Sequence, residues 1–404
     1  MTITLLVGAR PNFIKAAPLW RALSQMPQVR LLLVHTGQHW QPEMCDVFFK
    51  ELGLPTPIRC IPADSTSNRP LSRVALAAAL EPLLRALHPD WTVVIGDVTT
   101  AAAGALAAYR AGLPLAHVEA GLRCGDQEMA EEQNRIFADR LAQVLFATEP
   151  SAVANLLREG IAPERIHLVG NVLIDALLQT LPAASHKPWQ QVVHQHAYTE
   201  QVLSPENSWA NGYVLCTFHR AENVDSPQRL RRLVRLLLDV SQQRLLVFPV
   251  HPRTEQKLHQ QQLWAALSTC PTVALLRPVP YSDMVCLQKN ARAVLTDSGG
   301  VQEETTVLGV PCLTLRPSTE RPITLQYGAN VLLSPEHPAA VVEWLQRFWS
   351  AATSPAVRPP LWDGRAAERI ARVLTRTMPF TGDSTPETIS TLPYRRETPV
   401  YSDQ

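Results

Sequence analysis

The fold is decided by the stretch AVLTDSGGVQEETTVLG, residues 293–309. It starts with an apolar run of strand length, continues through a turn of small residues, and ends in a helical pattern that Gly309 can terminate. The paired glycines of the turn expose backbone N–H groups at the positive end of a helix, where a pyrophosphate can bind. One turn into that helix, Glu304 can accept hydrogen bonds from ribose hydroxyl groups. The alternative is a simple tight turn followed by a solvated helix face.

The same alternation of short apolar runs and longer helical patterns extends from this stretch in both directions. Runs of Val, Ile and Leu without polar alternation are typical of parallel strands that are buried on both faces. We therefore expect an α/β protein with two doubly wound, Rossmann-like domains that face each other across a cleft. The predicted strands span residues 3–8, 29–35, 91–95, 115–119, 144–147, 166–169, 213–217, 244–250, 272–276, 293–296, 311–315 and 330–333.

The length of 404 residues suits two or three domains at roughly 150 residues each. We place an N-terminal Rossmann-like domain at residues 1–181 and a C-terminal one at 212–364, joined by a polar linker at 182–211. A C-terminal helix at 365–378 is a candidate for packing back on the first domain. Residues 379–404 are rich in Thr, Pro, Ser and charge, which predicts a mobile tail.

Composition excludes several classes of protein. Lys and Arg number 37 and Asp and Glu number 36, so the formal net charge is +1, and we expect no nucleic acid partner. Charged residues interrupt the longest apolar stretches, 71–87 and 101–118, before they reach membrane-spanning length. The N-terminus lacks the pattern of a signal peptide. We therefore expect a cytoplasmic protein with no membrane partner.

Polar residues stand at the carboxyl ends of most predicted strands, which is where open parallel sheets bind ligands. Two facing sheets would gather these residues in the cleft between the domains, the predicted active site. The motifs at these strand ends are GARP (8–11), HTGQH (35–39), GDVTT (96–100), HVEAGLR (117–123), TFHR (217–220), HPR (251–253) and DSGG (297–300).

Three carboxyl groups are candidates for proton transfer. Asp97 and Glu119 each follow an apolar strand, and Glu131 lies in the sequence AEEQNR. Burial and neighbouring negative charge raise a carboxyl pKa toward the range that a general acid or base needs. The structural alternatives are helix capping for Asp97 and an ion pair with Arg135 or Arg123 for Glu131.

Cationic and imidazole groups near the same ends can bind phosphate. Arg10 and Lys15 bracket the start of the first predicted helix, and Arg321 lies near a strand end. His219, with Arg220 behind it, can stabilise a leaving diphosphate or give it a proton. Ordinary surface charge and a structural histidine are the alternatives for these residues.

Redox and metal chemistry are not indicated. The sequence has neither a G-x-G-x-x-G dinucleotide turn nor a G-x-x-x-x-G-K-[ST] phosphate loop, so we expect no nicotinamide and no ATP-driven transfer. The histidine pairs His35/His39 and His194/His196 lack an H-E-x-x-H pattern or a cysteine pair. The seven cysteines are scattered, which favours reduced thiols. We therefore expect no metal and no cofactor.

Taken together, these motifs resemble those of the non-hydrolysing UDP-N-acetylglucosamine 2-epimerase family, in order over residues 1–376. Single motifs of this kind arise by chance, whereas the ordered set is highly specific. The matching segments are GARPNFIKAAP (8–18), TGQH (36–39), GDVTT (96–100), HVEAGLR (117–123), AEEQNR (130–135), GNVLID (170–175), HRAEN (219–223), PVH (249–251), TDSGGVQEE (296–304) and TERP (319–322).

The resemblance implies a B-type glycosyltransferase fold in which the second domain holds most of the UDP and the sugar faces the first. Members of the family convert UDP-N-acetylglucosamine to UDP-N-acetylmannosamine without a redox cofactor, and the likeness suggests a homodimer. Their route eliminates UDP to leave a 2-acetamidoglucal and then adds UDP back after protonation from the other face. The small-molecule partner expected for this chain is therefore a UDP-sugar.

Residue by residue, the resemblance implies two groups in the site. Asp97, Glu119 and Glu131 surround the sugar and move protons, with His219 as a further catalytic candidate, and which carboxylate serves which face of C2 stays open. The residues expected to contact the UDP-sugar, beside Asp97 and Glu119, are Arg10, Lys15, His219, Arg220, Met284, Ser298, Gly299, Gly300, Glu304 and Arg321.

The chain departs from the family pattern at several positions. Asn12, Val98 and Ala130 replace a glutamate, a threonine and a proline, and Met284 stands where relatives often place an aromatic residue against uracil. The alternatives that stay open are a hydrolysing relative, an epimerase of a modified UDP-sugar, a glycosyltransferase and a catalytically silent nucleotide-sugar binding module.

Overall fold

The computed structural model describes residues 1–37, 49–60, 71–198, 212–328, 330–334, 336–350 and 357–377. The predicted tail at 379–404 and the second part of the predicted linker lie outside the described residues, as do Gln38 and His39 of the TGQH motif.

The N-terminal half is built on a seven-stranded parallel sheet of order β3-β2-β1-β4-β5-β6-β7. Six of its strands are predicted by the apolar runs, whereas β3 is missed because two residues at a sheet edge give no periodic pattern. The strands are β1 (Thr2–Val7), β2 (Arg30–His35), β3 (Arg59–Cys60), β4 (Trp91–Ile95), β5 (Leu115–Ala120), β6 (Val144–Ala147) and β7 (Ile166–Leu168).

The C-terminal half is built on a six-stranded parallel sheet of order β10-β9-β8-β11-β12-β13. Its strand order reverses between β8 and β11, as the order of the first sheet does between β1 and β4, so the two halves share one doubly wound plan. The strands are β8 (Tyr213–Thr217), β9 (Leu245–Pro249), β10 (Val273–Leu276), β11 (Ala293–Thr296), β12 (Cys312–Thr314) and β13 (Asn330–Leu332).

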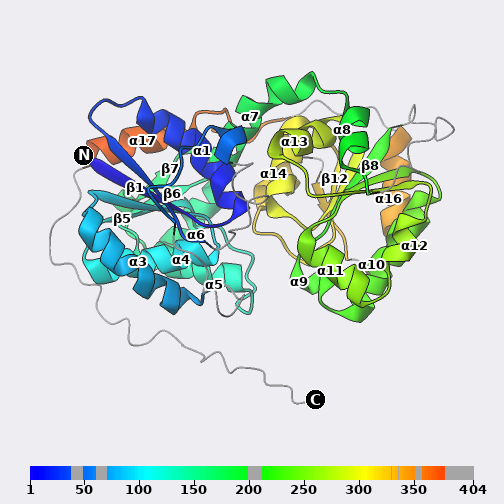
Figure 1. Cartoon of the computed structure of the whole chain (residues 1–404), viewed down its shortest axis with the longest axis horizontal. Coiled ribbons are helices and arrows are strands. Elements are labelled where there is room, and N and C mark those ends of the chain that lie inside the picture. The colour runs from blue at the N-terminus through cyan, green and yellow to red at the C-terminus, as the bar shows by residue number, and fades with distance from the viewer. Residues whose placement is uncertain are drawn as a thin grey trace, which may run out of the picture.

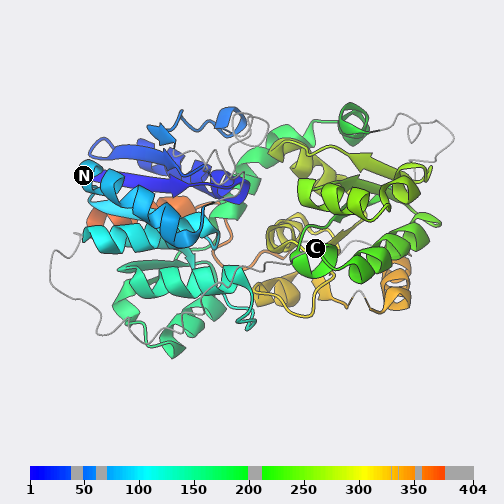
Figure 2. The same ribbon diagram turned by 60° about the horizontal axis from the view of Figure 1, so that its bottom comes forward.

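Helices cover both faces of each sheet, which is why central strands such as β4 and β8 are buried along their whole length (Figure 1, Figure 2). The helices are α1 (Arg10–Ser24), α3 (Arg73–Leu87), α4 (Thr99–Ala111), α5 (Ala130–Leu141), α6 (Pro150–Arg158), α7 (Val172–Ser185), α8 (Trp189–His196), α9 (Ala221–Val224), α10 (Pro227–Ser241), α11 (Pro252–Gln260), α12 (Trp264–Ser268), α13 (Tyr281–Asn290), α14 (Gly299–Leu308), α15 (Pro322–Tyr327), α16 (Pro338–Ser350) and α17 (Ala366–Arg376).

Helix α10 shows how the sequence pattern produces this packing. Its buried side chains Leu230, Leu233, Val234 and Leu237 recur at intervals of three or four residues, the spacing of one helix face. That face packs on the C-terminal sheet, and each fully buried Leu or Val stabilises the fold by about 1.5–3 kcal/mol. The exposed face carries arginines.

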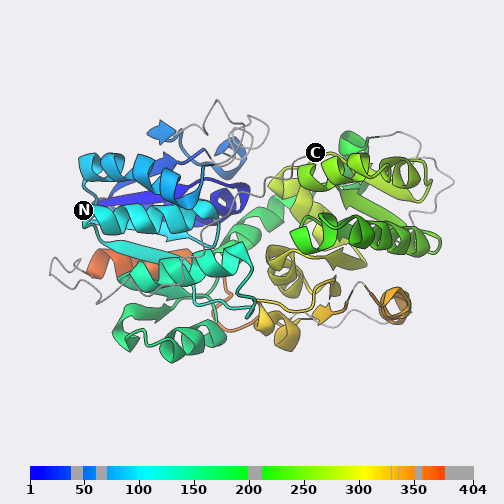
Figure 3. The same cartoon turned by 90° about the horizontal axis from the view of Figure 1, so that it is seen from below.

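The chain crosses from the C-terminal half back to the N-terminal half at its end. In all views α17 lies beside the N-terminal sheet (Figure 1, Figure 3). The Asp175 carboxylate in α7 accepts hydrogen bonds from Ala366 N (3.2 Å) and Ala367 N (2.7 Å), so it caps the start of α17. Gly170 permits this docking, because a Cβ at this position would lie 2.1 Å from the Leu361 carbonyl oxygen.

Candidate active site

The carboxyl ends of the two sheets face each other, and ion pairs join them. Glu131 of α5 accepts a hydrogen bond from Arg220, which follows β8, at 2.8 Å. Glu119 of β5 accepts one from Arg321, which precedes α15, at 2.5 Å. Arg10, at the start of α1, donates a hydrogen bond to a carbonyl oxygen in the segment before α13, at 3.1 Å. The structure therefore brings residues of both predicted groups together where the halves meet.

Asp97 follows β4 and precedes α4, so the start of the helix aims it at this junction. Its carboxylate lies 2.6 Å from Arg135 Nη2, and its side chain is 19% exposed. Burial alone would raise the pKa of Asp97, but Arg135, together with Lys15 and Arg321, lowers it to about 2. Asp97 is therefore ionised at neutral pH, and the raised pKa that we expected for a proton-transfer carboxyl group is not found at this residue.

Glu119 adopts an unusual backbone conformation. Its φ is +71°, in the left-handed region that non-glycine residues seldom occupy. The pairing of β5 with β6 shifts register between Val118 and Ala120, so Glu119 forms a bulge that turns its side chain toward Lys15 and Arg321. Glu119 is 2% exposed. Strained backbone of this kind is typical of functional sites.

A buried network supports the ends of β4 and β5. His117 lies 2.9 Å from the Gly96 carbonyl oxygen through Nε2 and 2.7 Å from Asp139 through Nδ1. Asp139 also accepts hydrogen bonds from Gly121 N and from Arg123, and its interactions with His117 and Arg123 lower its pKa despite its burial. These bonds fix the backbone on both sides of Asp97 and Glu119.

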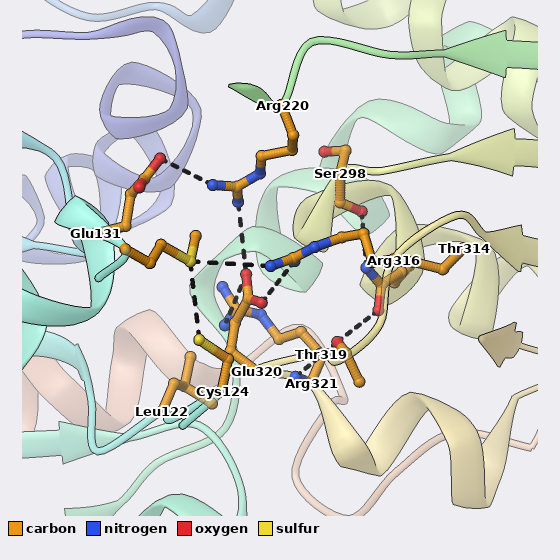
Figure 4. Close-up of polar contacts among 12 residues, drawn as sticks. Leu122, Cys124, Glu131, Arg220, Ser298, Thr314, Arg316, Thr319, Glu320 and Arg321 are labelled. Atoms are coloured by element: carbon orange, nitrogen blue, oxygen red, sulfur yellow. Dashed lines mark hydrogen bonds and ion pairs between the residues drawn. The ribbon is translucent and has the colours of Figure 1, made fainter. Parts of the chain in front are cut away.

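Glu131 takes part in a second cluster, around Glu320 (Figure 4). Arg220 bridges Glu131 and Glu320, and Arg316 lies 2.8 Å from Glu320. The pairing that we considered for Glu131 within its own helix is made by the neighbouring Glu132, whose carboxylate binds Arg135. Glu131 is thus directed across the junction.

The loop after β8 is organised by Asp297, which follows β11. Its buried carboxylate accepts hydrogen bonds from the backbone N–H groups of His219 and Arg220 and from Asn223 Nδ2. His219 Nδ1 lies 3.3 Å from the same carboxylate. Burial and the guanidinium groups of Arg220 and Arg253 lower the pKa of His219 to about 3, so the imidazole is neutral at pH 7.

The small residues at the start of α14 allow close packing. A Cβ at Gly299 would lie 2.8 Å from Glu320 Oε1, and one at Gly300 would lie 3.2 Å from Leu173 of α7. Ser298 precedes the first turn of α14, and the helix ends at Gly309 in the left-handed conformation, as the sequence predicts. The start of α14 therefore lies beside the cationic cluster around Glu320.

Glu304, the predicted partner of ribose, is bound by protein groups. Tyr281 donates its hydroxyl hydrogen to one carboxylate oxygen at 2.7 Å, and Gln288 Nε2 donates to the other at 2.6 Å. Burial raises the pKa of Glu304. Met284 lies on the same helix as these two donors, α13, and is partly buried against the core. The structure thus holds Glu304 in a fixed orientation.

Arg321 has unused hydrogen-bonding capacity. Its side chain is 4% exposed, and its Nη2 group donates to Glu119. Its Nε group lies 2.6 Å from Glu303 Oε1 and its Nη1 group lies 4.0 Å from Glu320 Oε1, but neither makes a hydrogen bond to a described residue. Buried guanidinium N–H groups without acceptors are costly, and an anion satisfies them. This geometry suits a phosphate-bearing substrate.

Several residues of this site are missing from the sequence predictions: Arg135, His117, Asp139, Asp297, Glu303, Arg316 and Glu320. His117, Arg135, Asp297, Glu303 and Glu320 stand inside quoted motifs, and their position there was a usable signal. Among the described residues, no group of three or more His, Cys, Asp or Glu side chains is arranged to hold a metal ion. No helix in the described ranges is long and apolar enough to cross a membrane.

On this geometry the chain falls in the class of α/β proteins with two Rossmann-like halves whose strand ends bring cations and carboxylates together. The family model described as UDP-N-acetylglucosamine 2-epimerase matches residues 21–375. A UDP-N-acetylglucosamine 2-epimerase of Methanocaldococcus jannaschii is 37% identical over 382 residues, which cover 93% of this chain and 99% of the relative. The chain therefore belongs to the UDP-N-acetylglucosamine 2-epimerase family, and the resemblance seen in the motifs is confirmed.

Two further relatives bear on fold and substrate. The crystal structure of the M. jannaschii enzyme in complex with UDP-GlcNAc and UDP matches with a TM-score of 0.82 at 36% identity, covering 93% of this chain and 100% of that chain. The two Rossmann-like halves thus have the B-type glycosyltransferase arrangement. A UDP-2,3-diacetamido-2,3-dideoxy-D-glucuronate 2-epimerase of Pseudomonas aeruginosa is 34% identical over 337 residues, which cover 82% of this chain and 88% of the relative.

Proposed function

We propose that this chain interconverts UDP-N-acetylglucosamine and UDP-N-acetylmannosamine without hydrolysing the glycosyl bond. The observation that carries the proposal is the presence of two ion-pair groups at the junction of the two sheets, Asp97 with Arg135 and Glu119 with Lys15 and Arg321, with Lys15 and Arg321 also acting on the charge of Asp97. Carboxyl groups that can transfer protons lie next to cations that suit a diphosphate, which supports the proposal. Membership of the epimerase family supports the same reaction.

The proposed reaction is an elimination followed by an addition. A base takes the proton from C2 of the sugar while the C1–O bond breaks, and the electron pair of that bond leaves with the UDP oxygen. The product is a 2-acetamidoglucal with a C1=C2 double bond. A proton is then added to the opposite face of C2 and the UDP oxygen bonds to C1 again. Atoms and electrons balance without an external oxidant or reductant.

The three carboxyl groups divide the proton transfers. We assign Asp97 as the base for the C2 proton, because Arg135 keeps it ionised over the working pH range. The proton for the opposite face falls to Glu119 or Glu131. Desolvation of the closed junction strengthens the interaction of Arg321 and Lys15 with the departing diphosphate. These cations stabilise the negative charge that develops on UDP.

His219 has a role at the leaving group in this proposal. Its neutral imidazole is held by Asp297 and is surrounded by guanidinium groups. A diphosphate bound beside it offsets that positive charge and raises its proton affinity. Protonated His219 then donates a hydrogen bond to the departing UDP.

Proton NMR of the protein with UDP-N-acetylglucosamine in deuterated water tests the proposal. The expected result is deuterium at C2 and the appearance of UDP-N-acetylmannosamine, with little free UDP. Free UDP accumulating in step with free sugar would instead identify a hydrolase. Turnover without an acceptor excludes a glycosyltransferase, and an unchanged spectrum with bound substrate would identify a silent binding module.

A second candidate substrate is a modified UDP-sugar. The observation that favours it is the similarity to the P. aeruginosa UDP-2,3-diacetamido-2,3-dideoxy-D-glucuronate 2-epimerase. Comparing kcat/KM for that nucleotide sugar and for UDP-N-acetylglucosamine decides between the two. The homodimer, the cytoplasmic location, the absence of a cofactor and a role in polysaccharide biosynthesis stay predictions.

A further inference from the structure

Glu303 is a buried acidic residue to which the proposed reaction assigns no part. It lies in the first half of α14, directly before Glu304, and is fully buried. Its Oε1 atom accepts a hydrogen bond from Asn171 Nδ2, at the start of α7, at 2.9 Å. Its Oε2 atom has no hydrogen-bond partner among the described residues. A buried carboxylate oxygen without a donor is strongly unfavourable, whereas a protonated oxygen carries no charge to be solvated.

The guanidinium group of Arg321 contacts both Glu303 and Glu119, and its hydrogen bond goes to Glu119. Arg321 Nε lies 2.6 Å from Glu303 Oε1, but it makes no hydrogen bond with it. By contrast, Arg321 Nη2 donates a hydrogen bond to Glu119. The geometry therefore directs the hydrogen bond of Arg321 at Glu119, whereas Glu303 has an ion pair with Arg321 and a hydrogen bond from Asn171 on Oε1 but no donor on Oε2.

Charge counting gives the same result. The charged groups that act on Glu303 are Arg321 and Lys15, which are positive, and Glu119 and Glu149, which are acidic. With Glu303 included, three buried acidic groups share two cations. Glu149 is also fully buried, and its Oε2 atom likewise lacks a partner among the described residues. A buried cluster of this composition reaches neutrality by holding one proton.

The electrostatic environment favours Glu303 as the site of that proton. Burial, with Glu119 and Glu149 nearby, raises the pKa of Glu303 to about 8, although Arg321 and Lys15 act in the opposite direction. Burial also raises the pKa of Glu149. Asp97 and Glu320, the other acidic groups near Arg321, have their own guanidinium partners in Arg135 and Arg316.

We propose that Glu303 is a positioning residue that holds a proton at neutral pH and thereby keeps the charge of Arg321 available to Glu119 and to the diphosphate of the substrate. Loss of this proton in alkaline solution adds a negative charge beside Arg321 and weakens UDP binding. The inference rests on the proposed function only in requiring that the site binds UDP.

Calorimetry of UDP binding as a function of pH tests this inference. In the wild-type protein the dissociation constant of UDP rises about tenfold as the pH passes from one unit below to one unit above the pKa of Glu303, which corresponds to about 1.4 kcal/mol. In Glu303→Gln, which mimics the protonated side chain, this rise is absent. The exposed Glu343→Gln on α16 is the matched control and keeps the wild-type pH dependence. The same rise in Glu303→Gln as in the wild type would overturn the inference.

The variant Glu149→Gln locates the proton. If Glu303 holds it, Glu149→Gln still loses UDP affinity in alkaline solution. A pH dependence that vanishes in Glu149→Gln and persists in Glu303→Gln would place the proton on Glu149 and contradict the proposal.

Infrared spectroscopy of the ligand-free protein gives a second readout that needs neither UDP nor turnover. The wild type is expected to show the C=O band of a protonated carboxyl group at neutral pH that disappears near the pKa of Glu303, and Glu303→Gln lacks this component. A wild-type spectrum without such a band overturns the inference even if Glu303→Gln fails to fold. UDP binding with the expected pH dependence but no exchange at C2 would contradict the proposed function alone.

Discussion

Asp97 and Asp297 occupy equivalent places in the two halves of the molecule. Each stands just after a strand at the point where the strand order of its sheet reverses. That strand is β4 for Asp97 and β11 for Asp297. Asp97 pairs with a single guanidinium group, which lowers its pKa to about 2, and its side chain is partly exposed at the junction. Asp297 is fully buried, binds backbone and amide N–H groups, and has a raised pKa because burial dominates.

The fold thus puts a carboxyl group at this place in each half, but the neighbouring residues determine its pKa and its hydrogen bonds. A directed cation keeps Asp97 charged and suited to take a proton. Three N–H donors make Asp297 the framework of the loop that carries His219 and Arg220. We therefore expect substitutions at the two aspartates to have different consequences.

The largest expected effect follows from Asp97→Asn. The substitution keeps the size of the side chain but removes the base, so the rate of deuterium exchange at C2 falls about 10³-fold. UDP binding stays within about threefold of the wild type by calorimetry. An Asp97→Asn enzyme that exchanges C2 at the wild-type rate would reject the assigned role.

A smaller effect, on binding, is expected for Asp297→Asn. The new amide can no longer accept all the hydrogen bonds that organise the loop after β8, and its NH₂ group opposes the backbone donors. UDP affinity measured by calorimetry falls about tenfold, and the free energy of unfolding falls by about 1–3 kcal/mol. Unchanged UDP affinity in a folded variant would show that this loop does not bind the diphosphate.

Arg135→Gln sharpens the comparison by making Asp97 resemble Asp297. Without the guanidinium group, burial raises the pKa of Asp97, so the acidic limb of the kcat/KM profile moves up by one pH unit or more. Arg140→Gln, an exposed change on the same helix, is the control. An acidic limb that does not move would show that Asp97 ionisation is not what the profile reports.

The same pairing predicts how stability depends on acidity. The pKa of Asp97 is lowered in the folded state from an ordinary value near 4 to about 2. Its stabilising contribution is therefore complete above the ordinary pKa and is lost as the pH falls toward 2, by about 2 kcal/mol. Asp97→Asn lacks this component. Urea unfolding of both proteins across this range measures the difference, and parallel curves would contradict the assignment.

The smallest effect is expected for an exposed ion pair far from the site. Arg85 pairs with Glu81 one turn earlier on α3, and its side chain is 53% exposed. Arg85→Gln is expected to change the free energy of unfolding by less than about 0.5 kcal/mol and to leave C2 exchange unchanged. A cost above about 1 kcal/mol would contradict the small contribution expected of an exposed ion pair.

Much of the architecture could be predicted from the sequence, because strands buried on both faces leave uninterrupted apolar runs. All the described strands except β3 follow from this pattern. The strand-end positions of Asp97 and Glu119 also follow, because polar residues directly after apolar runs are easily recognised. The family follows from the order of the motifs, which is a likeness to other sequences and not a physical consequence of the residue pattern.

The partners of the site residues could not be predicted in the same way. Arg135 lies 38 positions from Asp97, and Arg321 lies 202 positions from Glu119. Such pairs depend on how the sheets and halves pack, which periodicity does not encode. The left-handed backbone of Glu119 could not be predicted either. Glycine usually marks such a conformation, and the nearest glycine in this segment, Gly121, stands two residues later. The alternative of a solvated helix face for Glu303 and Glu304 is excluded, because both are buried.

We propose that the N-terminal half moves the C2 proton while the C-terminal half holds most of the UDP. The most direct test measures C2 deuterium exchange at saturating UDP-N-acetylglucosamine in Asp97→Asn and Asp297→Asn side by side. We expect Asp97→Asn to lose C2 exchange. At saturating substrate, Asp297→Asn is expected to exchange C2 at close to the wild-type rate. Equal loss of exchange in both folded variants, or retained exchange in Asp97→Asn, would contradict this proposal.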